Sequence, residues 1–319
     1  MKRSTQVRVG DLFAGAGLFS ESFRSSGARS TFAIELDPLA AASYANNVGI
    51  HVRVGSVESV MPEKVDVIVA GPPCQGFSTL GRRDPKDVRN QLCLAIPAWV
   101  TACRAEVLVV ENVPQFLHSH YWNEMAKELE ATGFEVSTWT LNAADFGVPQ
   151  RRQRSFTIAS KRGIPTPPKP RGHSTASEAF GRIRKGDRMH VWPKSSELAA
   201  ARMQLVPRLG DRRNILEDAP HLCPPSWFTI GNNATDVWGR IDPDVPANTL
   251  RCDFQNPSKG RYLHPRLNRV ISLREGARLQ QIPDTWNFHG HRTAITRQIG
   301  NGVPLGLGRA IAKQILSLF

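Results

Sequence analysis

The first half of the chain alternates short apolar runs with segments of helical periodicity. The apolar runs, which predict β-strands, are residues 7–13, 30–34, 65–70, 106–110, 134–141 and 155–159. The segments with a helical pattern are residues 18–25, 39–47, 92–103 and 121–132. This alternation is typical of an α/β fold whose mostly parallel sheet is covered by helices on both faces. Ligands of such sheets bind at the carboxyl ends of the strands, so the residues that follow each apolar run are the first candidates for function.

The pattern changes after Ser160. Residues 161–171 contain four prolines and predict a stiffened linker. From 161 to 264 we find little strand or helix periodicity, and 17 Lys and Arg stand against 10 Asp and Glu. The scattered aromatic residues Trp192, Trp227, Phe228 and Trp238 argue against a disordered insertion. We therefore expect a second, smaller, loop-rich and basic domain over 161–264.

Helical patterns return near the end of the chain. Ser272 and Glu275 have the spacing of a capping box, which predicts a helix over 272–280. Residues 305–318 predict an amphipathic final helix. We expect the main domain to comprise residues 1–160 and 265–319.

Charge and composition narrow the class of protein. The 319 residues carry a net charge of +13, which favours a polyanionic partner such as nucleic acid. No apolar stretch reaches the roughly 20 residues of a membrane helix, and no apolar run follows the charged N-terminus as in a signal peptide. The five cysteines form no C-x-x-C pair, so we expect no metal site and no disulfide framework. The sequence thus predicts a cytoplasmic protein without a membrane partner.

The first apolar run leads into a loop of small residues, Asp11-Leu-Phe-Ala-Gly-Ala-Gly-Leu-Phe-Ser20. Gly15 and Gly17 fit the dinucleotide-binding pattern G-x-G-x-x-G, whereas the third position is Ser20. On its own the loop is explained equally well by structural turn glycines. The second run ends at Glu35, and an acid at that place can bind the two hydroxyls of a ribose. Loop and acid together indicate a cofactor of the adenosine type.

A cysteine stands in an unusual setting after the third apolar run. Residues 71–78 read Gly-Pro-Pro-Cys-Gln-Gly-Phe-Ser, and the two prolines stiffen the backbone before Cys74. The next run leads to Glu111, a carboxylate that is costly to bury unless it is paired or functional. Arg152 and Arg154 share one face of the last strand because they are two residues apart. This places them either to bind a phosphate or to neutralise Glu111 and the thiolate. Each feature alone has a structural explanation, but together at strand ends they indicate a catalytic site.

These motifs resemble, in order and over nearly the full length of the chain, those of the DNA (cytosine-5)-methyltransferase family. The matching segments are Asp11–Ser20, Glu35, Gly71–Ser78, Glu111–Val113, Gln150-x-Arg152-x-Arg154, Arg278–Asp284 and Gln298–Pro304. The resemblance implies a Rossmann-like, S-adenosylmethionine-dependent methyltransferase domain with a target-recognition domain. It implies double-stranded DNA as the partner and base flipping as the way to reach the target.

The resemblance also implies roles for individual residues. The implied catalytic residues are Cys74, Glu111, Arg152 and Arg154. The implied cofactor-binding residues are Phe13, Ala14, Gly15, Gly17, Leu18, Glu35, Ser56, Val57, Pro72, Leu92, Asn301 and Val303. The implied DNA contacts are Gln75, Ser78, Arg82, Arg83, Asn112 and Gln150. The segment 77–90 resembles the loop that closes over the flipped base.

Two positions depart from the family pattern. A second glycine is usual where Leu18 stands, and an aspartate facing the adenine amino group is usual where Ser56 stands. A serine hydroxyl accepts a hydrogen bond but carries no charge, so these departures bear on cofactor affinity.

Three alternatives remain at this stage. A tRNA cytosine-5 methyltransferase shares the scaffold, but RNA-acting relatives typically carry proline where Gly76 stands. A catalytically silent DNA-binding relative would not need the intact set of Cys74, Glu111 and the arginines. A nicotinamide-dependent oxidoreductase would have the third glycine of its binding pattern where Ser20 stands. The compact length favours a prokaryotic or phage enzyme. A monomer is the default expectation, and DNA binding would associate the protein with the nucleoid. A paired restriction endonuclease that shares its site is a hypothesis.

Overall fold

The computed structural model describes residues 6–58, 60–73, 88–230 and 234–319. Its centre is a seven-stranded sheet of order β3-β2-β1-β4-β5-β7-β6. The strands are β1 (Arg8–Leu12), β2 (Arg29–Glu35), β3 (Val52–Val54), β4 (Val67–Ala70), β5 (Val107–Asn112), β6 (Glu135–Asn142) and β7 (Gln153–Ser160). Pairs among β1 to β5 are parallel, whereas β7 runs antiparallel to β5 and β6. The prediction of an α/β fold with a mostly parallel sheet is confirmed.

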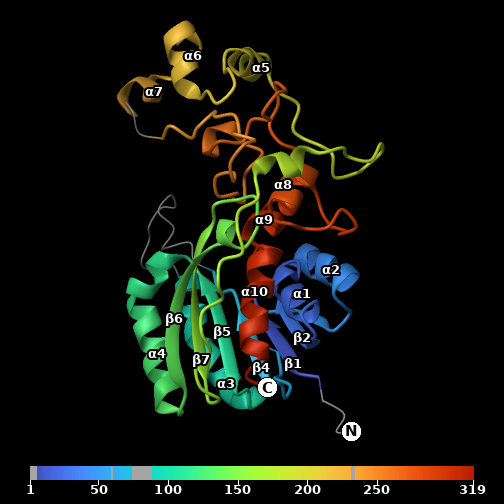
Figure 1. The fold of residues 1–319 in the computed structure, drawn as a ribbon, viewed down its shortest axis with the longest axis vertical. Helices are drawn as coiled ribbons and strands as arrows, with labels where there is room; N and C mark the ends of the chain where they lie inside the picture. The colour runs from blue at the N-terminus through green and yellow to red at the C-terminus, as the bar shows by residue number, and fades with distance from the viewer. Residues whose placement is uncertain (1–5, 59, 74–87, 231–233) are drawn as a thin grey trace.

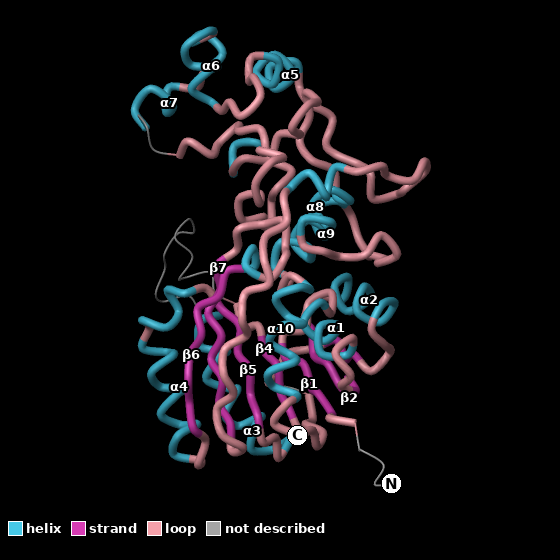
Figure 2. The backbone as a smooth tube through the Cα atoms, viewed as in Figure 1, coloured by secondary structure: helices cyan, strands magenta, loops and turns pink. Residues whose placement is uncertain are grey.

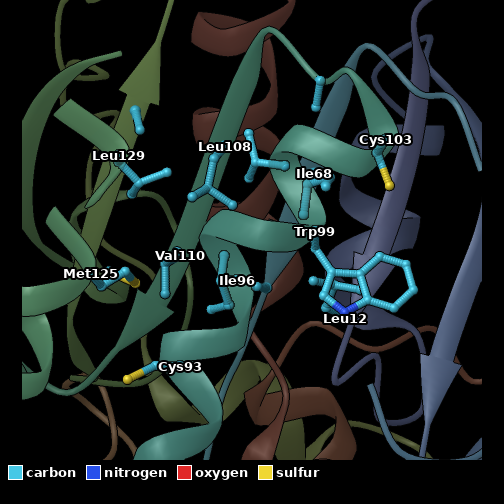
Figure 3. Close-up of a cluster of buried hydrophobic side chains, with 14 of the residues drawn as sticks. Leu12, Ile68, Cys93, Ile96, Trp99, Cys103, Leu108, Val110, Met125 and Leu129 are labelled. Carbon is cyan, nitrogen blue, oxygen red and sulfur yellow. The ribbon is translucent and has the colours of Figure 1, made fainter. Parts of the chain in front are cut away.

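Both faces of the central strands are buried, and alternate residues enter two different cores. Val67 and Val69 of β4 pack toward α1 (Leu18–Arg24) and α10 (Leu305–Leu316), which lie side by side. Ile68 belongs to the opposite core, with α3 (Ile96–Cys103) and α4 (His120–Ala131). Figure 3 shows this second core from the side of α3. Burial on both sides explains why these strands read as continuous apolar runs rather than alternating ones.

The other elements of this half agree with the sequence except in two places. The helix expected over 92–103 is a 3₁₀ segment, η1 (Val88–Ala95), followed by α3. Pro97 stands in the first turn of α3, where its missing N–H is tolerated. The helix α2 (Pro38–Asn47) matches its prediction, whereas β3 was not predicted because it has only three residues.

Residues beyond β7 are rich in loops, as Figure 2 shows. Three short helices occur there that the sequence pattern did not predict, namely α5 (Glu197–Gln204), α6 (Arg212–Asp218) and α7 (Pro225–Ile230). A separate small core holds them, with Met203, Ile215, Trp227 and Trp238 as members. Trp227 and Trp238 are therefore core residues, whereas Trp192 and Phe228, which also argued against disorder, are exposed.

The last part of the chain returns to the sheet. The helix α8 (Leu273–Leu279) has the predicted capping box between Ser272 and Glu275, and α10 follows its prediction. The helix α9 (Arg292–Asn301) was not predicted. A third core joins α8 and α9 to residues such as Leu250 and Tyr262. Because this core crosses position 264, the domain boundaries stay a prediction. Within the described residues, no helix combines the length and apolar character that a membrane span requires.

Candidate active site

The loop after β1 contains three residues in a left-handed backbone conformation, which residues with a side chain rarely adopt. Phe13, Gly15 and Gly17 all have positive φ, at 62°, 55° and 91°. A Cβ on Gly17 would lie 2.7 Å from Val48 Cγ2 and 2.8 Å from Tyr44 Cδ2, so only glycine fits there. A Cβ on Gly15 would meet nothing within 4 Å. Gly17 thus lets the loop approach α2, while Gly15 borders open space.

Glu35, at the carboxyl end of β2, holds this loop. Its Oε2 accepts a hydrogen bond from the Gly15 N–H at 2.7 Å, and its Oε1 accepts one from the Asp37 N–H at 2.8 Å. Burial raises the pKa of Glu35, and the two N–H donors partly oppose that rise. The expected ribose acid is therefore half-buried beside the loop, where a ligand of the loop would meet it.

Ser20, the departure from the glycine pattern, has a clear structural role. Its hydroxyl donates to Asp11 Oδ2 at 2.7 Å and accepts from the Tyr44 hydroxyl at 2.8 Å. Asp11 is 1% exposed, and burial raises its pKa to about 7. A glycine at position 20 would remove the hydroxyl that joins these buried groups. The sequence did not identify Asp11 or Tyr44 as members of this network.

Ser56 and Val57 follow β3 and are fixed differently. The Val57 carbonyl accepts a hydrogen bond from Trp99 Nε1 at 2.8 Å, which ties this segment to α3. Ser56 Oγ accepts from the Glu58 N–H at 3.2 Å and lies 3.4 Å from Glu58 Oε2. An exposed carboxylate therefore stands beside the serine that replaces the expected aspartate.

The carboxyl ends of β4 and β5 lie next to each other. A Cβ on Gly71 would be 3.9 Å from Glu111 Oε2, the nearest atom to it. Pro72, the next residue, is buried. Cys74, Gln75, Ser78, Arg82 and Arg83 lie outside the described residues, and so does most of the predicted closing loop.

Glu111 and Arg154 form the charged centre of this edge. Glu111 is 8% exposed, and its Oε1 lies 3.0 Å from Arg154 Nε. The two atoms are close enough for an ion pair but are not aligned as a hydrogen bond. The buried Glu111 carboxylate therefore has its counter-charge in Arg154.

Asn112 completes β5 with a buried carboxamide. Its Oδ1 accepts a hydrogen bond from the Val113 N–H at 2.8 Å, and the residue is 3% exposed. Among the described residues, no acceptor faces its Nδ2. A buried donor without an acceptor is costly, which makes this atom a candidate to meet a ligand.

Gln150 and Arg152 both reach Leu250. Gln150 Oε1 accepts from the Leu250 N–H at 2.7 Å, and Arg152 Nη1 donates to the Leu250 carbonyl at 3.0 Å. Gln150 Nε2 donates to the Leu279 carbonyl and to Gln280 Oε1, both at 3.2 Å. Gln150 has no exposed surface. This arrangement does not support the expected DNA contact of Gln150, because its whole carboxamide is used inside the protein.

The late segment 298–304 returns to the loop after β1. Val303 is buried, Leu18 is 2% exposed, and the Leu18 side chain fills the space beside Gly302. Asn301 Oδ1 accepts a hydrogen bond from Cys252 Sγ at 2.7 Å. Leu92, a half-buried residue of η1, was also expected at the cofactor. The Cys252 contact and the Leu250 contacts were not predicted, because no local sequence pattern encodes them.

The described residues include no group of three or more His, Cys, Asp or Glu that could hold a metal ion. The site is instead a row of strand ends. The loop after β1 and Glu35 lie at one part of the row, and Glu111, Arg152 and Arg154 lie at another. The order β2-β1-β4-β5-β7 brings these segments to one edge.

Comparison with known proteins agrees with this geometry. The sequence profile of the family described as C-5 cytosine-specific DNA methylase matches residues 7–317. Type II methyltransferase M.DdeI of Desulfomicrobium norvegicum is 31% identical over 97% of this chain and 88% of its own length. Type II methyltransferase M.XorII of Xanthomonas oryzae pv. oryzae is 31% identical over 96% of this chain and 84% of its own.

Solved structures share the fold at lower identity. The Entamoeba histolytica methyltransferase EhMeth aligns with a TM-score of 0.70 at 14% identity. The S. pombe Dnmt2 methyltransferase aligns with a TM-score of 0.63 at 16% identity. Both alignments cover 98% of this chain and 99% of the other. By its sequence match and by the order of its strands and motifs, the chain belongs to the family of C-5 cytosine-specific DNA methyltransferases.

Proposed function

We propose that this protein transfers a methyl group from S-adenosylmethionine to carbon 5 of a cytosine in double-stranded DNA. The observation that carries this proposal is the ion pair of Glu111 and Arg154 beside Gly71, where the Gly-Pro-Pro-Cys segment begins. A carboxylate and a guanidinium at that place can bind the polar edge of a pyrimidine, and Cys74 follows Gly71 three positions later in the sequence.

The residues of the loop after β1 fit S-adenosylmethionine. Open space borders Gly15, and the Glu35 carboxylate lies beside it at the place where a ribose would be recognised. When bound, this group supplies an electrophilic methyl group. We propose that the residues holding it are Phe13, Ala14, Gly15, Gly17, Leu18, Glu35, Ser56, Val57, Pro72, Leu92, Asn301 and Val303.

Carbon 5 of cytosine is a weak nucleophile, and the chain supplies the groups that activate it. The Cys74 thiolate adds to carbon 6, which moves electron density to carbon 5. Glu111 binds the ring at nitrogen 3, and Arg152 lies near the carbonyl oxygen and stabilises charge that develops there. Arg154 holds the Glu111 carboxylate in place. After methylation, loss of the proton from carbon 5 expels Cys74.

DNA binding follows from charge and from the site. The target atoms are inside the duplex, so the cytosine has to be flipped out before it reaches Glu111. We propose that Gln75, Ser78, Arg82, Arg83 and the buried Asn112 carboxamide meet the DNA, and that residues 161–264 read the sequence. The net charge of +13 predicts that affinity falls steeply with salt.

The relatives named above are type II methyltransferases. On that basis we propose that this enzyme modifies the site of a partner restriction endonuclease. We further propose that it acts as a monomer in the cytoplasm, associated with the nucleoid through DNA. A genomic locus without a nuclease gene would count against the pairing.

Bisulfite sequencing tests the activity directly. Plasmid DNA is incubated with S-adenosylmethionine and either the natural protein or Cys74→Ala. We expect protected cytosines in one short motif with the natural protein and none with the variant. If DNA is bound but no cytosine is protected, DNA methylation is the wrong reaction, and the same assay on tRNA tests the nearest alternative.

A further inference from the structure

Residues 250–252 run between the two halves of the candidate site. At one end, Leu250 is held on both its N–H and its carbonyl, by Gln150 at 2.7 Å and Arg152 at 3.0 Å. Gln150 and Arg152 are two residues apart in an extended segment, which places both side chains on the same face. The backbone of 150–152 is also tied to this region, because the Arg151 N–H donates to the Ala247 carbonyl at 2.7 Å. The position of Arg152 therefore depends on residues almost 100 positions away in the sequence.

At the other end, the same short segment meets the end of α9. The Cys252 thiol donates to Asn301 Oδ1 at 2.7 Å. The backbones are in close contact as well, since a Cβ on Gly300 would lie 2.7 Å from both Arg251 C and Cys252 Cα. Burial raises the pKa of Cys252, so the group at this contact is the neutral thiol, which can donate.

A second connection runs through the protein in parallel. Gln150 Nε2 donates to Gln280 Oε1 at 3.2 Å, and Gln280 Nε2 donates to the Ile299 carbonyl at 2.8 Å. Gln150 and Gln280 both have no exposed surface. Two sets of hydrogen bonds, which share the Gln150 carboxamide, therefore join the arginine segment to the end of α9.

We propose that residues 250–252 form a positioning bridge in which Gln150 and Cys252 fix Arg152, at the target base, relative to Asn301, at the cofactor. The bridge rests on the proposed function, which gives those two residues their ligands. Methyl transfer needs the two reactants aligned, and a displacement of about 1 Å can cost on the order of 100-fold in rate. Gln150 and Cys252 are positioning residues, because they act through Leu250 and Asn301.

The thiol end is tested with three single variants. Binding of S-adenosylhomocysteine is measured by calorimetry, and methylation is measured in parallel, for Cys252→Ala, Cys252→Ser and Cys223→Ala. We expect Cys252→Ala to weaken binding roughly 2- to 10-fold, the effect of one hydrogen bond, and Cys252→Ser to restore it because a hydroxyl also donates. Cys223 is the control, since it is a half-buried thiol that donates to the Ala219 carbonyl at 3.8 Å, away from Asn301 in the sequence.

A double variant separates this contact from general packing. If the thiol acts through Asn301, Cys252→Ala should add less than 2-fold to the loss of affinity caused by Asn301→Ala. Full additivity of the two losses, or a Cys252→Ser variant as weak as Cys252→Ala, would overturn this end of the bridge.

The carboxamide end is tested with Gln150→Met, which keeps length and removes all of the hydrogen bonds, and Gln150→Glu, which keeps the acceptor for Leu250. We expect methylation to fall about 10-fold or more in Gln150→Met, with DNA affinity within 2-fold of the natural protein. A loss of DNA affinity at unchanged turnover would instead make Gln150 a DNA contact. If Gln150→Met does not fold, Gln150→Glu and the Cys252 series decide.

These outcomes are separable from failure of the proposed function. A natural protein that binds S-adenosylhomocysteine but methylates no DNA would contradict the function, while the calorimetry would still decide the Cys252 contact. A natural protein that methylates DNA, with every bridge variant equally active, would contradict the bridge alone.

Discussion

Leu18 occupies the space that a side chain at position 302 would need. Residue 302 is glycine, and a Cβ built on it would overlap Leu18 Cδ1. Leu18 is 2% exposed and belongs to the same core as Ile299 and Leu305, on either side of Gly302. Leu18 therefore stands where the family usually has a second glycine. Its side chain fits because the residue that packs against it, Gly302, has no side chain.

This relationship predicts a non-additive pair of substitutions. Gly302→Ala should lower the free energy of unfolding by about 1–3 kcal/mol, because the added methyl group overpacks the contact with Leu18. In Leu18→Ala the same methyl group has room, so the double variant should lose less stability than the two single losses together. Urea denaturation of the four proteins measures this. Gly181→Ala is the control, since a Cβ there meets nothing closer than 3.9 Å. Strict additivity would show that the two residues are independent.

The sheet was predictable because strands that are buried on both faces have continuous apolar runs in the sequence. Val67–Ala70 and Val107–Val110 contain only apolar residues, which no exposed strand would retain. The helix α9 was not predictable in the same way, since Arg292–Asn301 has polar residues at most positions and is identified as a helix by the burial of Ala294, Ile295 and Ile299. Short elements such as β3 carry too few residues to show any period.

The site was predictable to the extent that it lies at strand ends. The neighbouring ends of β4 and β5 and the shared face of Arg152 and Arg154 follow from geometry, and the Glu111–Arg154 pair is there. One partner of Arg152 is a backbone carbonyl 98 residues away, at Leu250. A backbone carbonyl has no residue type, so the sequence carries no sign of that contact.

The Glu111–Arg154 pair predicts that stability and activity can be separated. Arg154→Ala leaves the Glu111 carboxylate buried without its counter-charge and should cost about 2–3 kcal/mol of stability, along with methylation. Adding Glu111→Gln removes the buried charge and should recover much of that stability without recovering methylation. Thermal unfolding and the plasmid assay are run on both variants. Arg29→Ala is the control, because Arg29 is exposed at the amino end of β2, and the candidate site is at the carboxyl end of that strand. If the double variant is no more stable than Arg154→Ala, the cost does not come from the unpaired carboxylate.

Asp11 predicts a pH dependence of stability. Its pKa in the folded protein is about 7, whereas an aspartate in an unfolded chain has a pKa of about 3.9. Between these values the folded state keeps a proton that the unfolded chain has lost, so this group lowers the free energy of unfolding as pH rises. The full effect is on the order of 4 kcal/mol.

Asp11→Asn should remove this term while keeping an acceptor for Ser20. Relative to the natural protein, the variant should gain stability as pH is raised from 5 to 8, measured by chemical denaturation at each pH. Glu130→Gln changes an exposed carboxylate of α4 and serves as the control. Parallel stability profiles for Asp11→Asn and the natural protein would mean that Asp11 is ionised throughout this range.

The contacts of Arg240 predict that the region around α5 to α7 can be destabilised by one substitution while the affinity for the cofactor is kept. Arg240 is 5% exposed, and its Nε and two amino groups donate to the carbonyls of Met203, Val206, His264 and Leu267 and to Asn268 Oδ1. The apolar core of this region is small, so buried carbonyls that lose their donor should weigh heavily there.

Arg240→Met should therefore cost about 3 kcal/mol or more, and limited proteolysis should cut within 197–230 faster than in the natural protein. Affinity for DNA should fall at least about 10-fold, because residues 161–264 are proposed to read it. Affinity for S-adenosylhomocysteine should stay within about 2-fold, since the loop after β1 packs on other elements. Arg208→Met is the matched control, because Arg208 forms an exposed ion pair with Asp244. If Arg240→Met loses both affinities together, the two parts of the molecule fold as one cooperative unit and the predicted division into domains has no energetic meaning.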